Sequence, residues 1–227
     1  MQPHQLEWTP ERIQAFWDHY SKHPDTYFSA LHGRSLIGYV GRRIRIGTPL
    51  DYGCGSGHLL SYLADAGFTT VYGVDQSPES QAATVRRIGS RAEVHVGPAP
   101  EAESVDTAFL VEVVEHMDDG ALDAAIAAIR SALKPGGHLV ITTPNEEDLA
   151  ANSVLCTECG AMFHVMQHVR AWDAASLSTY VETKGFETVS AGATILSPHA
   201  GLLDRLWRGA KLALGKRPNL IYIGRKA

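Results

Sequence analysis

A glycine-rich turn between an apolar run and a helical pattern is the feature that most constrains the fold. The run at 49–52 leads into Gly53, Gly55 and Gly57, after which apolar residues recur at helical spacing. Glycines in such a strand–turn–helix unit let the backbone approach a ligand closely and point the helix N-terminus at it. Glycines in turns are more often structural, so this turn alone is only a weak indication of a cofactor site.

Strand-like apolar runs alternate with helical patterns after this turn. Because alternating strands and helices form parallel sheets, the order predicts an α/β fold. We expect a helical cap at 1–46, a flap at 152–170 and an inserted amphipathic helix at 200–216, within a single domain covering 1–227. The expected strands after the turn are 69–75, 92–96, 105–111, 138–143, 186–196 and 220–224, with helices at 78–88, 121–133 and 173–184.

Charge and hydropathy narrow the function classes. A net charge of −5 argues against a protein that tracks along nucleic-acid phosphates. No run of about 18 apolar residues appears, and residues 1–10 lack the pattern of a secretory signal, so we expect a cytoplasmic protein. From Gly201 onward, however, the sequence has seven basic residues and one acidic residue, Asp204. The helix at 200–216 is read first as core packing, but its basic face also allows a lid, an anionic substrate or peripheral contact with a membrane that carries a lipid acceptor.

Two acids beside the glycines sharpen the cofactor prediction. Asp75 stands about 20 residues further on, where an acid can accept both hydroxyls of an adenosine ribose. Asp51 precedes the first glycine, where it would repel a pyrophosphate but suit a ligand that carries an ammonium and a sulfonium. The alternatives are a turn-capping role for Asp51 and an Asx-type turn for Asp75 before Ser77. Together with the glycine spacing, Asp51 favours S-adenosylmethionine over a dinucleotide.

These segments resemble the motifs of class I (Rossmann-like) S-adenosylmethionine-dependent methyltransferases. The glycine turn is similar to their first motif, and the segment ending at Asp75 is similar to their second. The resemblance implies a seven-stranded, mostly parallel sheet with helices on both faces and one antiparallel strand. It also implies a cofactor that lies across the C-terminal ends of the first strands. The matching segments are 50–57, 73–75, 105–116, 134–137 and 185–186.

Cofactor-binding residues follow from motif position in this resemblance. The first acid and the glycines would hold the methionine moiety, the second acid the ribose, and the backbone near 97–99 the adenine. The segment at 95–100 lacks the acidic residue that many relatives have there. The residues assigned to the cofactor on this basis are Asp51, Gly53, Gly55, Gly57, Asp75, Gln76, Gly97 and Leu110.

A carboxylate and histidine run follows the fourth strand. Glu112, Glu115 and His116 are spaced to share one side of a helical turn, where they could hold a divalent ion that lowers the pKa of a substrate hydroxyl. The run resembles the metal ligands of ubiquinone-pathway O-methyltransferases and of small-RNA 2′-O-methyltransferases. His168, near Trp172, resembles the distal ligand of the RNA enzymes. The alternative is that Glu112 binds near the cofactor while the other two complete the turn.

A second group of metal-ligand residue types lies in the expected flap. Cys156 and Cys159 form a Cys-x2-Cys knuckle, and His164 and His168 follow. These four are the ligand types of a tetrahedral zinc site, although the spacing to the first histidine is shorter than in zinc fingers. The alternative is a reduced thiol pair with surface histidines. The two metal hypotheses compete for His168.

The sequence therefore predicts an enzyme that transfers a methyl group from S-adenosylmethionine to a small-molecule or lipid-linked acceptor, favouring oxygen. His116 and His168 are the candidates for the catalytic base or ligand. An RNA 2′-O-methyltransferase that uses the Glu/Glu/His/His set is the alternative substrate class. A dehydrogenase fits poorly because of Asp51, and a non-catalytic binding module with a retained cofactor pocket is the remaining alternative.

Overall fold

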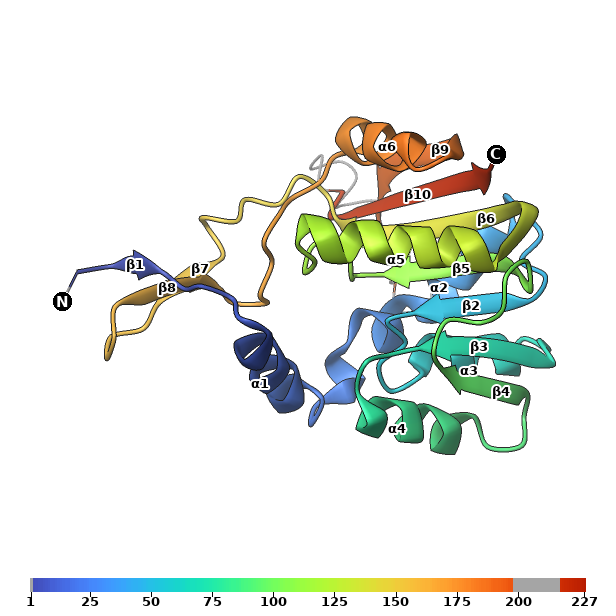
Figure 1. Ribbon diagram of the computed structural model, residues 1–227, viewed down its shortest axis with the longest axis horizontal. Coiled ribbons are helices and arrows are strands. Elements are labelled where there is room, and N and C mark those ends of the chain that lie inside the picture. Colours follow the sequence, from blue (N-terminus) through green and yellow to red (C-terminus); the bar gives the residue numbers. More distant parts are fainter. Residues whose placement is uncertain (1, 198–216) are drawn as a thin grey trace.

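A seven-stranded sheet forms the centre of the computed structural model, which describes residues 2–197 and 217–227 (Figure 1). The helix expected at 200–216 lies outside the described residues. The strands, in sheet order, are β4 (Glu93–Gly97), β3 (Thr70–Val74), β2 (Pro49–Tyr52), β5 (Val105–Val111), β6 (Leu133–Pro144), β10 (Asn219–Lys226) and β9 (Phe186–Thr194). All pairs are parallel except those of β10, which runs antiparallel to both neighbours. The predicted seven-stranded, mostly parallel sheet is confirmed.

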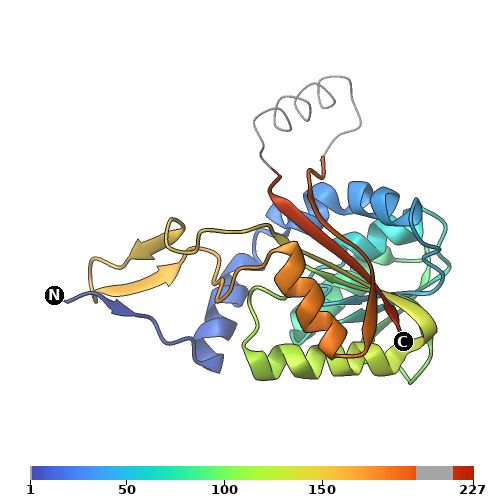
Figure 2. The same cartoon turned by 90° about the horizontal axis from the view of Figure 1, so that it is seen from above.

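Helices cover both faces of this sheet (Figure 2). Because side chains alternate across a strand, Phe109 and Val140 point to one face while their neighbours Leu110 and Ile141 point to the other, and all four are fully buried. This alternation buries two apolar layers, which is the main stabilising contribution to the fold. The first layer contains α2 (Phe28–Gly41), α3 (His58–Asp65) and α4 (Pro78–Ile88), and the second contains α5 (Asp119–Ala132) and α6 (Ala174–Thr183).

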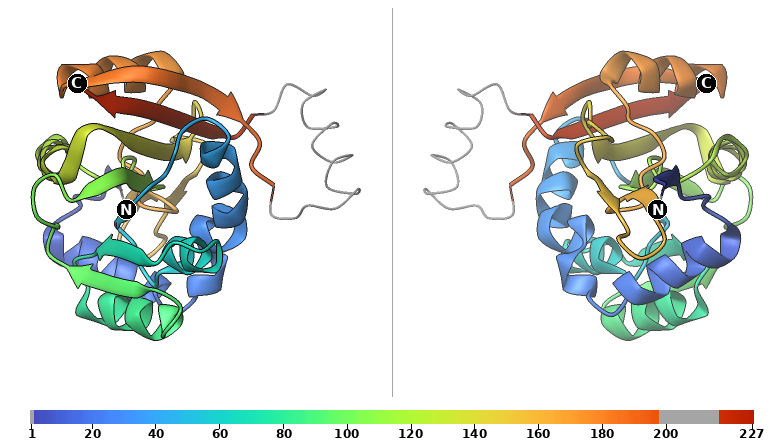
Figure 3. Two further views of the ribbon diagram at one scale, coloured as in Figure 1. Left: turned by 90° about the vertical axis from the view of Figure 1, so that its right-hand side faces the viewer. Right: turned by 90° about the vertical axis from the view of Figure 1, so that its left-hand side faces the viewer.

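Polar residues fix the starts of these helices. The Ser77 side chain accepts the backbone N–H of Ser80 before the first turn of α4, and Asp118 caps α5 in the same way. Asp173 and Ser176 form a reciprocal capping box at α6. No helix within the described ranges is long and apolar enough to cross a lipid bilayer. Seen along the strands, the sheet twists from β9 and β10 at one edge to β3 and β4 at the other (Figure 3).

A small second sheet projects beyond the carboxyl ends of the parallel strands (Figures 1 and 2). The hairpin of β7 (Ser153–Leu155) and β8 (Ala161–His164) lies within the flap expected at 152–170, and β1 (His4–Gln5) pairs parallel with β8. The region expected as a helical cap holds α1 (Pro10–Tyr20), a 3-10 turn η1 (Pro24–Thr26) and α2, but it begins with this short strand. A two-residue strand leaves no periodic pattern, so β1 could not be predicted from the sequence.

Candidate functional site

The glycine turn joins β2 to α3 at the point where the strand order reverses, which is the usual ligand crevice of such sheets. Gly53, Gly55 and Gly57 all have positive φ, at 83°, 51° and 77°. A Cβ on Gly57 would lie only 2.7 Å from Cγ2 of Thr84, so a side chain there would also collide with α4. The turn therefore needs glycine both for its backbone conformation and for its close packing.

The two acids predicted to bind the cofactor lie beside this turn. Burial, and next the charge of Asp75, raise the pKa of Asp51 to about 7. Asp75 accepts the backbone N–H of Gly55 at Oδ2 and that of Ser77 at Oδ1, each at a donor–acceptor distance of 2.9 Å. The Asx-type turn considered from the sequence is therefore present. Each carboxylate oxygen can accept a second hydrogen bond, so this turn is compatible with a ribose contact.

The other predicted cofactor residues follow the same edge of the sheet. Gln76 is exposed in the turn after Asp75, and Gly97 ends β4. The loop of Gly97, Pro98 and Ala99 borders a hollow of about 590 Å³. Leu110 is fully buried, and its side chain packs in the core layer under α5. A contact of Leu110 with the cofactor would thus have to come from its backbone.

The turn after β5 carries the predicted carboxylate and histidine run. It is a non-helical turn in which the N–H of His116 donates to the carbonyl of Val113 over 3.1 Å. The structure nevertheless brings predicted residues together, because ligand atoms of Glu115, His116 and His168 all lie within 4.8 Å of one another. Glu112 stands close enough for its charge to raise the pKa of Glu115.

Burial controls the electrostatics of this cluster. It raises the pKa of both Glu112 and Glu115, and it lowers the pKa of His116 to about 3, with His168 adding to that effect. Oε1 of Glu112, Oε1 of Glu115 and Nδ1 of His116 are buried with no hydrogen-bond partner among the described residues. Orphaned oxygen and nitrogen acceptors of this kind fit a divalent ion, because carboxylates and neutral imidazoles are its common ligands.

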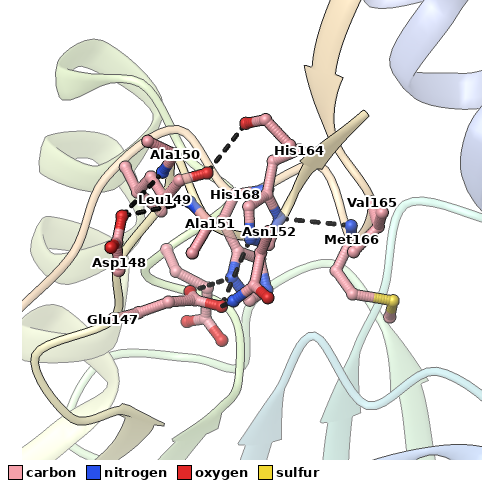
Figure 4. Close-up of polar contacts among 12 residues, drawn as sticks. Glu147, Asp148, Leu149, Ala150, Ala151, Asn152, His164, Val165, Met166 and His168 are labelled. Carbon is pink, nitrogen blue, oxygen red and sulfur yellow. Dashed lines mark hydrogen bonds and ion pairs between the residues drawn. The ribbon is translucent and has the colours of Figure 1, made fainter. Parts of the chain in front are cut away.

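Glu147 belongs to the same cluster but was not among the residues predicted from the sequence. Its carboxylate contacts Nδ1 of His168 and lies 3.2 Å from Nε2 of His164 (Figure 4). These three residues form a second group whose ligand atoms lie within 4.8 Å of one another. The signal that could have revealed Glu147 is its place in an acidic run just beyond the carboxyl end of β6, where functional residues of α/β sheets gather.

The cysteine knuckle lies at the turn of the β7–β8 hairpin. Cys156 follows β7, and Cys159 is exposed two residues before β8. Backbone N–H groups of Cys159 and Glu158 lower the pKa of Cys156. Within the described part of the chain, neither cysteine shares a three-ligand group with a histidine. The structure thus joins His164 and His168 to Glu147 instead, and zinc at the knuckle stays a prediction.

Backbone strain is concentrated around the carboxylate and histidine cluster. Four non-glycine residues in the described ranges have positive φ, and three of them, Glu112, Glu146 and Gln167, belong to the cluster or adjoin Glu147 and His168. Such conformations cost roughly 1–3 kcal/mol each and persist only where the surrounding structure determines them. The strain is an independent indication that this cluster is functional.

Aromatic residues from the N-terminal helices cover both halves of the site. The Trp17 ring meets the His116 ring edge-on, with centroids 4.8 Å apart. The Tyr27 ring lies 3.5 Å from where a Cβ on Gly55 would be. The N-terminal region therefore contacts the histidine cluster through α1 and the glycine turn through the residue before α2.

Comparisons with known proteins agree with the predicted family and fold. The sequence model of a family described as a methyltransferase domain matches residues 24–191. A probable S-adenosylmethionine-dependent methyltransferase of Mycolicibacterium smegmatis is 31% identical over 149 residues, which cover 61% of this chain and 51% of that protein. The mitochondrial ubiquinone biosynthesis O-methyltransferase of Homo sapiens is 29% identical over 168 residues, which cover 67% of this chain and 44% of that protein.

The fold is similar to that of a solved enzyme. The structure of Burkholderia thailandensis 1,6-didemethyltoxoflavin-N1-methyltransferase, with 1,6-didemethyltoxoflavin and S-adenosylhomocysteine bound, matches with a TM-score of 0.64. The sequences are 17% identical, and the match covers 100% of both chains. The chain spans about half the length of the first curated relatives that it matches.

Proposed function

The chain belongs to the methyltransferase domain family and is a class I S-adenosylmethionine-dependent methyltransferase, and we propose that it methylates an oxygen of a small-molecule or lipid-linked acceptor. The observation that carries this proposal is the buried cluster of Glu112, Glu115, His116 and His168 beyond the end of β5. The similarity to the human ubiquinone biosynthesis O-methyltransferase supports transfer to oxygen.

The glycine turn and its acids would position the cofactor for this transfer. Asp51 would face the methionine ammonium, and Asp75 the ribose. The sulfonium is already an activated leaving group, so the main task of the protein is to place the acceptor in line with the methyl group. As the new O–C bond forms, the S–C bond breaks and S-adenosylhomocysteine leaves.

The cluster would prepare the acceptor oxygen. A hydroxyl is a poor nucleophile until it loses its proton, and a divalent ion held by Glu112, Glu115, His116 and His168 supplies Lewis acidity that lowers the hydroxyl pKa. Burial lowers the pKa of His116 and of His168, so both imidazoles are unprotonated near neutral pH. In that state each ring can bind the ion or accept the acceptor proton.

An assay with three acceptor classes tests this proposal. Purified protein is incubated with methyl-labelled S-adenosylmethionine and with phenols, prenylated phenols or short RNAs, with Mg²⁺ or with EDTA. We expect methylation of a phenolic class, its loss in EDTA and its return when Mg²⁺ or Mn²⁺ is added. Methylation of RNA alone would favour the RNA 2′-O-methyltransferase, and cofactor binding without any transfer would favour the binding module.

A pair of variants links the activity to the cluster. Glu115→Gln removes a buried ligand, and we expect it to lower activity at least about 100-fold while S-adenosylhomocysteine still binds. Glu146→Gln makes the same chemical change at an exposed position close by, and its activity should match that of the unchanged protein. Equal activity of the two variants would contradict the role of the cluster.

A further inference from the structure

We propose that Glu147 is a positioning residue, which holds Nδ1 of His168 and so directs Nε2 of the same ring to the ion bound by Glu112, Glu115 and His116. The inference deepens the proposed function and rests on its metal-dependent form. The earlier metal hypotheses counted His168 as a ligand but named no group that orients its ring. Glu147 is such a group.

Each carboxylate oxygen of Glu147 has its own contacts. Oε1 accepts Nδ2–H of Asn152 over 3.0 Å and lies 3.2 Å from Nε2 of His164, and Oε2 contacts Nδ1 of His168. Carboxylate oxygens accept hydrogen bonds, so Nδ1 of His168 presents its N–H to Glu147, whereas Nε2 of His164 lies near Oε1 without a hydrogen bond. Figure 4 shows the Glu147 side chain among these three partners.

The backbone independently fixes the tautomer of His164. Nδ1 of His164 accepts the N–H of Met166 over 3.2 Å and that of His168 over 3.3 Å. Its own proton therefore lies on Nε2, which is 3.2 Å from Oε1 of Glu147 but makes no hydrogen bond with it. The rings of His164 and His168 stack with centroids 4.3 Å apart and planes 17° from parallel, so His164 also supports the second ring from the side.

The position of the His168 proton then follows. With Nδ1–H directed at Glu147, the lone pair of Nε2 is the free donor of a neutral imidazole. A carboxylate that binds the far nitrogen of a metal-bound histidine is a recurrent arrangement, since it fixes both the tautomer and the ring orientation. The His116 ring, 4.8 Å from the His168 ring between centroids, lies in the predicted ion site that Nε2 would join.

A second ion at Glu147, His164 and His168 fits the contacts less well. Both oxygens of Glu147 already accept hydrogen bonds, from Asn152 and from His168. By contrast, Oε1 of Glu112 and Oε1 of Glu115 have no partner among the described residues, whereas in the second group this holds only for Nε2 of His164, which carries a proton. An ion gains more by satisfying orphaned oxygens than by displacing donors from a satisfied carboxylate.

Nuclear magnetic resonance of the imidazole nitrogens in metal-free protein tests the tautomer directly. We expect His168 to carry its proton on Nδ1. In Glu147→Gln the amide can donate to Nδ1, so the proton should move to Nε2 and block the ligand atom. This measurement needs neither a metal nor a substrate, so it can fail separately from the proposed function. A proton on Nε2 in the unchanged protein would overturn the inference.

A calorimetric Mn²⁺ titration tests the consequence. Loss of an outer-shell partner typically weakens metal binding by about 10- to 100-fold, which we expect for Glu147→Gln. Glu147→Asp keeps an acceptor-only group and should recover part of the affinity, and Glu146→Gln is the matched control that should change nothing. Thermal melting and S-adenosylhomocysteine binding verify that each variant is folded.

The outcomes separate the two proposals. If the unchanged protein binds no Mn²⁺, the metal-dependent function fails, and the positioning inference fails with it. If it binds one Mn²⁺ and Glu147→Gln binds equally well, only the inference is overturned. If it binds two ions and Glu147→Gln loses one of them, Glu147 is a ligand and the positioning role is wrong. One ion per chain, with an affinity that falls in Glu147→Gln and partly returns in Glu147→Asp, supports it.

Discussion

The indole Nε1–H of Trp17 donates to Oε1 of Gln167 over 3.1 Å, and so joins α1 to the loop that carries His168. Gln167 is fully buried, and its Nε2–H donates in turn to the carbonyl oxygen of His116 over 3.2 Å. One glutamine therefore connects the N-terminal helix to both histidine-bearing segments. The arrangement makes Trp17 part of the wall of the proposed acceptor site.

Replacing this indole should weaken binding of the acceptor more than binding of the cofactor. Trp17→Phe keeps a ring against His116 but leaves the buried Oε1 of Gln167 without a donor, at a cost of about 1–3 kcal/mol in the free energy of unfolding. We expect a severalfold rise in KM for the acceptor with unchanged S-adenosylhomocysteine affinity. Steady-state kinetics measures the KM for the acceptor, and calorimetry measures the affinity for S-adenosylhomocysteine. Trp8→Phe is the control, because Trp8 packs on Phe16 and Phe163 in the same aromatic group.

The glycine turn should not tolerate a side chain at Gly57. Gly57→Ala places a Cβ at φ 77° and 2.7 Å from Thr84, so we expect at least about a tenfold loss of cofactor affinity along with lower stability. Gly67→Ala is the matched control, because φ there is 94° and no atom lies within 4 Å of the added Cβ. The melting temperature of Gly67→Ala should fall while its affinity for the cofactor is unchanged. Equal affinity of both variants would remove Gly57 from the cofactor site.

Cofactor affinity should depend on pH through Asp51. Its raised pKa, about 7, leaves the acid mostly protonated below neutrality, whereas a nearby ammonium favours the carboxylate. Binding should therefore release a proton, and affinity should rise with pH by up to about tenfold per unit below 7. Calorimetry between pH 5.5 and 7.5 tests this, and Asp51→Asn should bind weakly with a flat profile. An equally steep profile in the variant would assign the proton to another group.

Asp51 should also affect the stability of the cofactor-free protein. Its folded pKa lies above its ordinary value, so the folded state binds this proton more tightly than the unfolded chain does. Stability is therefore lost as pH rises from about 4 to about 7. Asp51→Asn should raise the melting temperature more at pH 8 than at pH 4. A gain that does not depend on pH would show that the side chain acts through packing.

The cysteines provide a test between the two metal hypotheses. Neither cysteine belongs to a three-ligand group within the described part of the chain, so Cys156→Ser with Cys159→Ser should leave Mn²⁺ affinity unchanged. Metal analysis of the same double variant reports on zinc. Loss of one zinc per chain would establish the knuckle as a metal site. Loss of Mn²⁺ affinity would show that the hairpin shapes the carboxylate and histidine cluster.

The central strands of the large sheet could be predicted because each is a largely buried apolar run between strong turn signals, and the edge strands β4 and β9 because turn residues bound them. The predicted bounds of the helix at 78–88 and the strand at 105–111 are those of α4 and β5. Ser77 and Pro78 mark the start of α4 by a capping side chain and a fixed φ, which are local properties. The pairing of β1 with β8 is a long-range contact of two short segments, and nothing local indicates it.

Part of the candidate site could also be predicted from the sequence. Three of the four predicted ligands, Glu115, His116 and His168, lie together in the structure because the turn after β5 and the loop after β8 end at one edge of the sheet. Glu147 was missed because its role depends on the ring nitrogen that it contacts, which spacing cannot reveal. The conformation of the turn was also hidden, because the positive φ of Glu112 takes the chain out of the expected helical path.

The pairing of β1 with β8 also bears on the order of folding. It joins His4 to Ala161, more than 150 positions away along the chain, and closing so long a loop costs entropy that only late contacts repay. The sheet can form from neighbouring segments first. The segment before α1 can pair with β8 only after the hairpin has formed, so a chain still in synthesis should form its glycine turn well before β1 is in place.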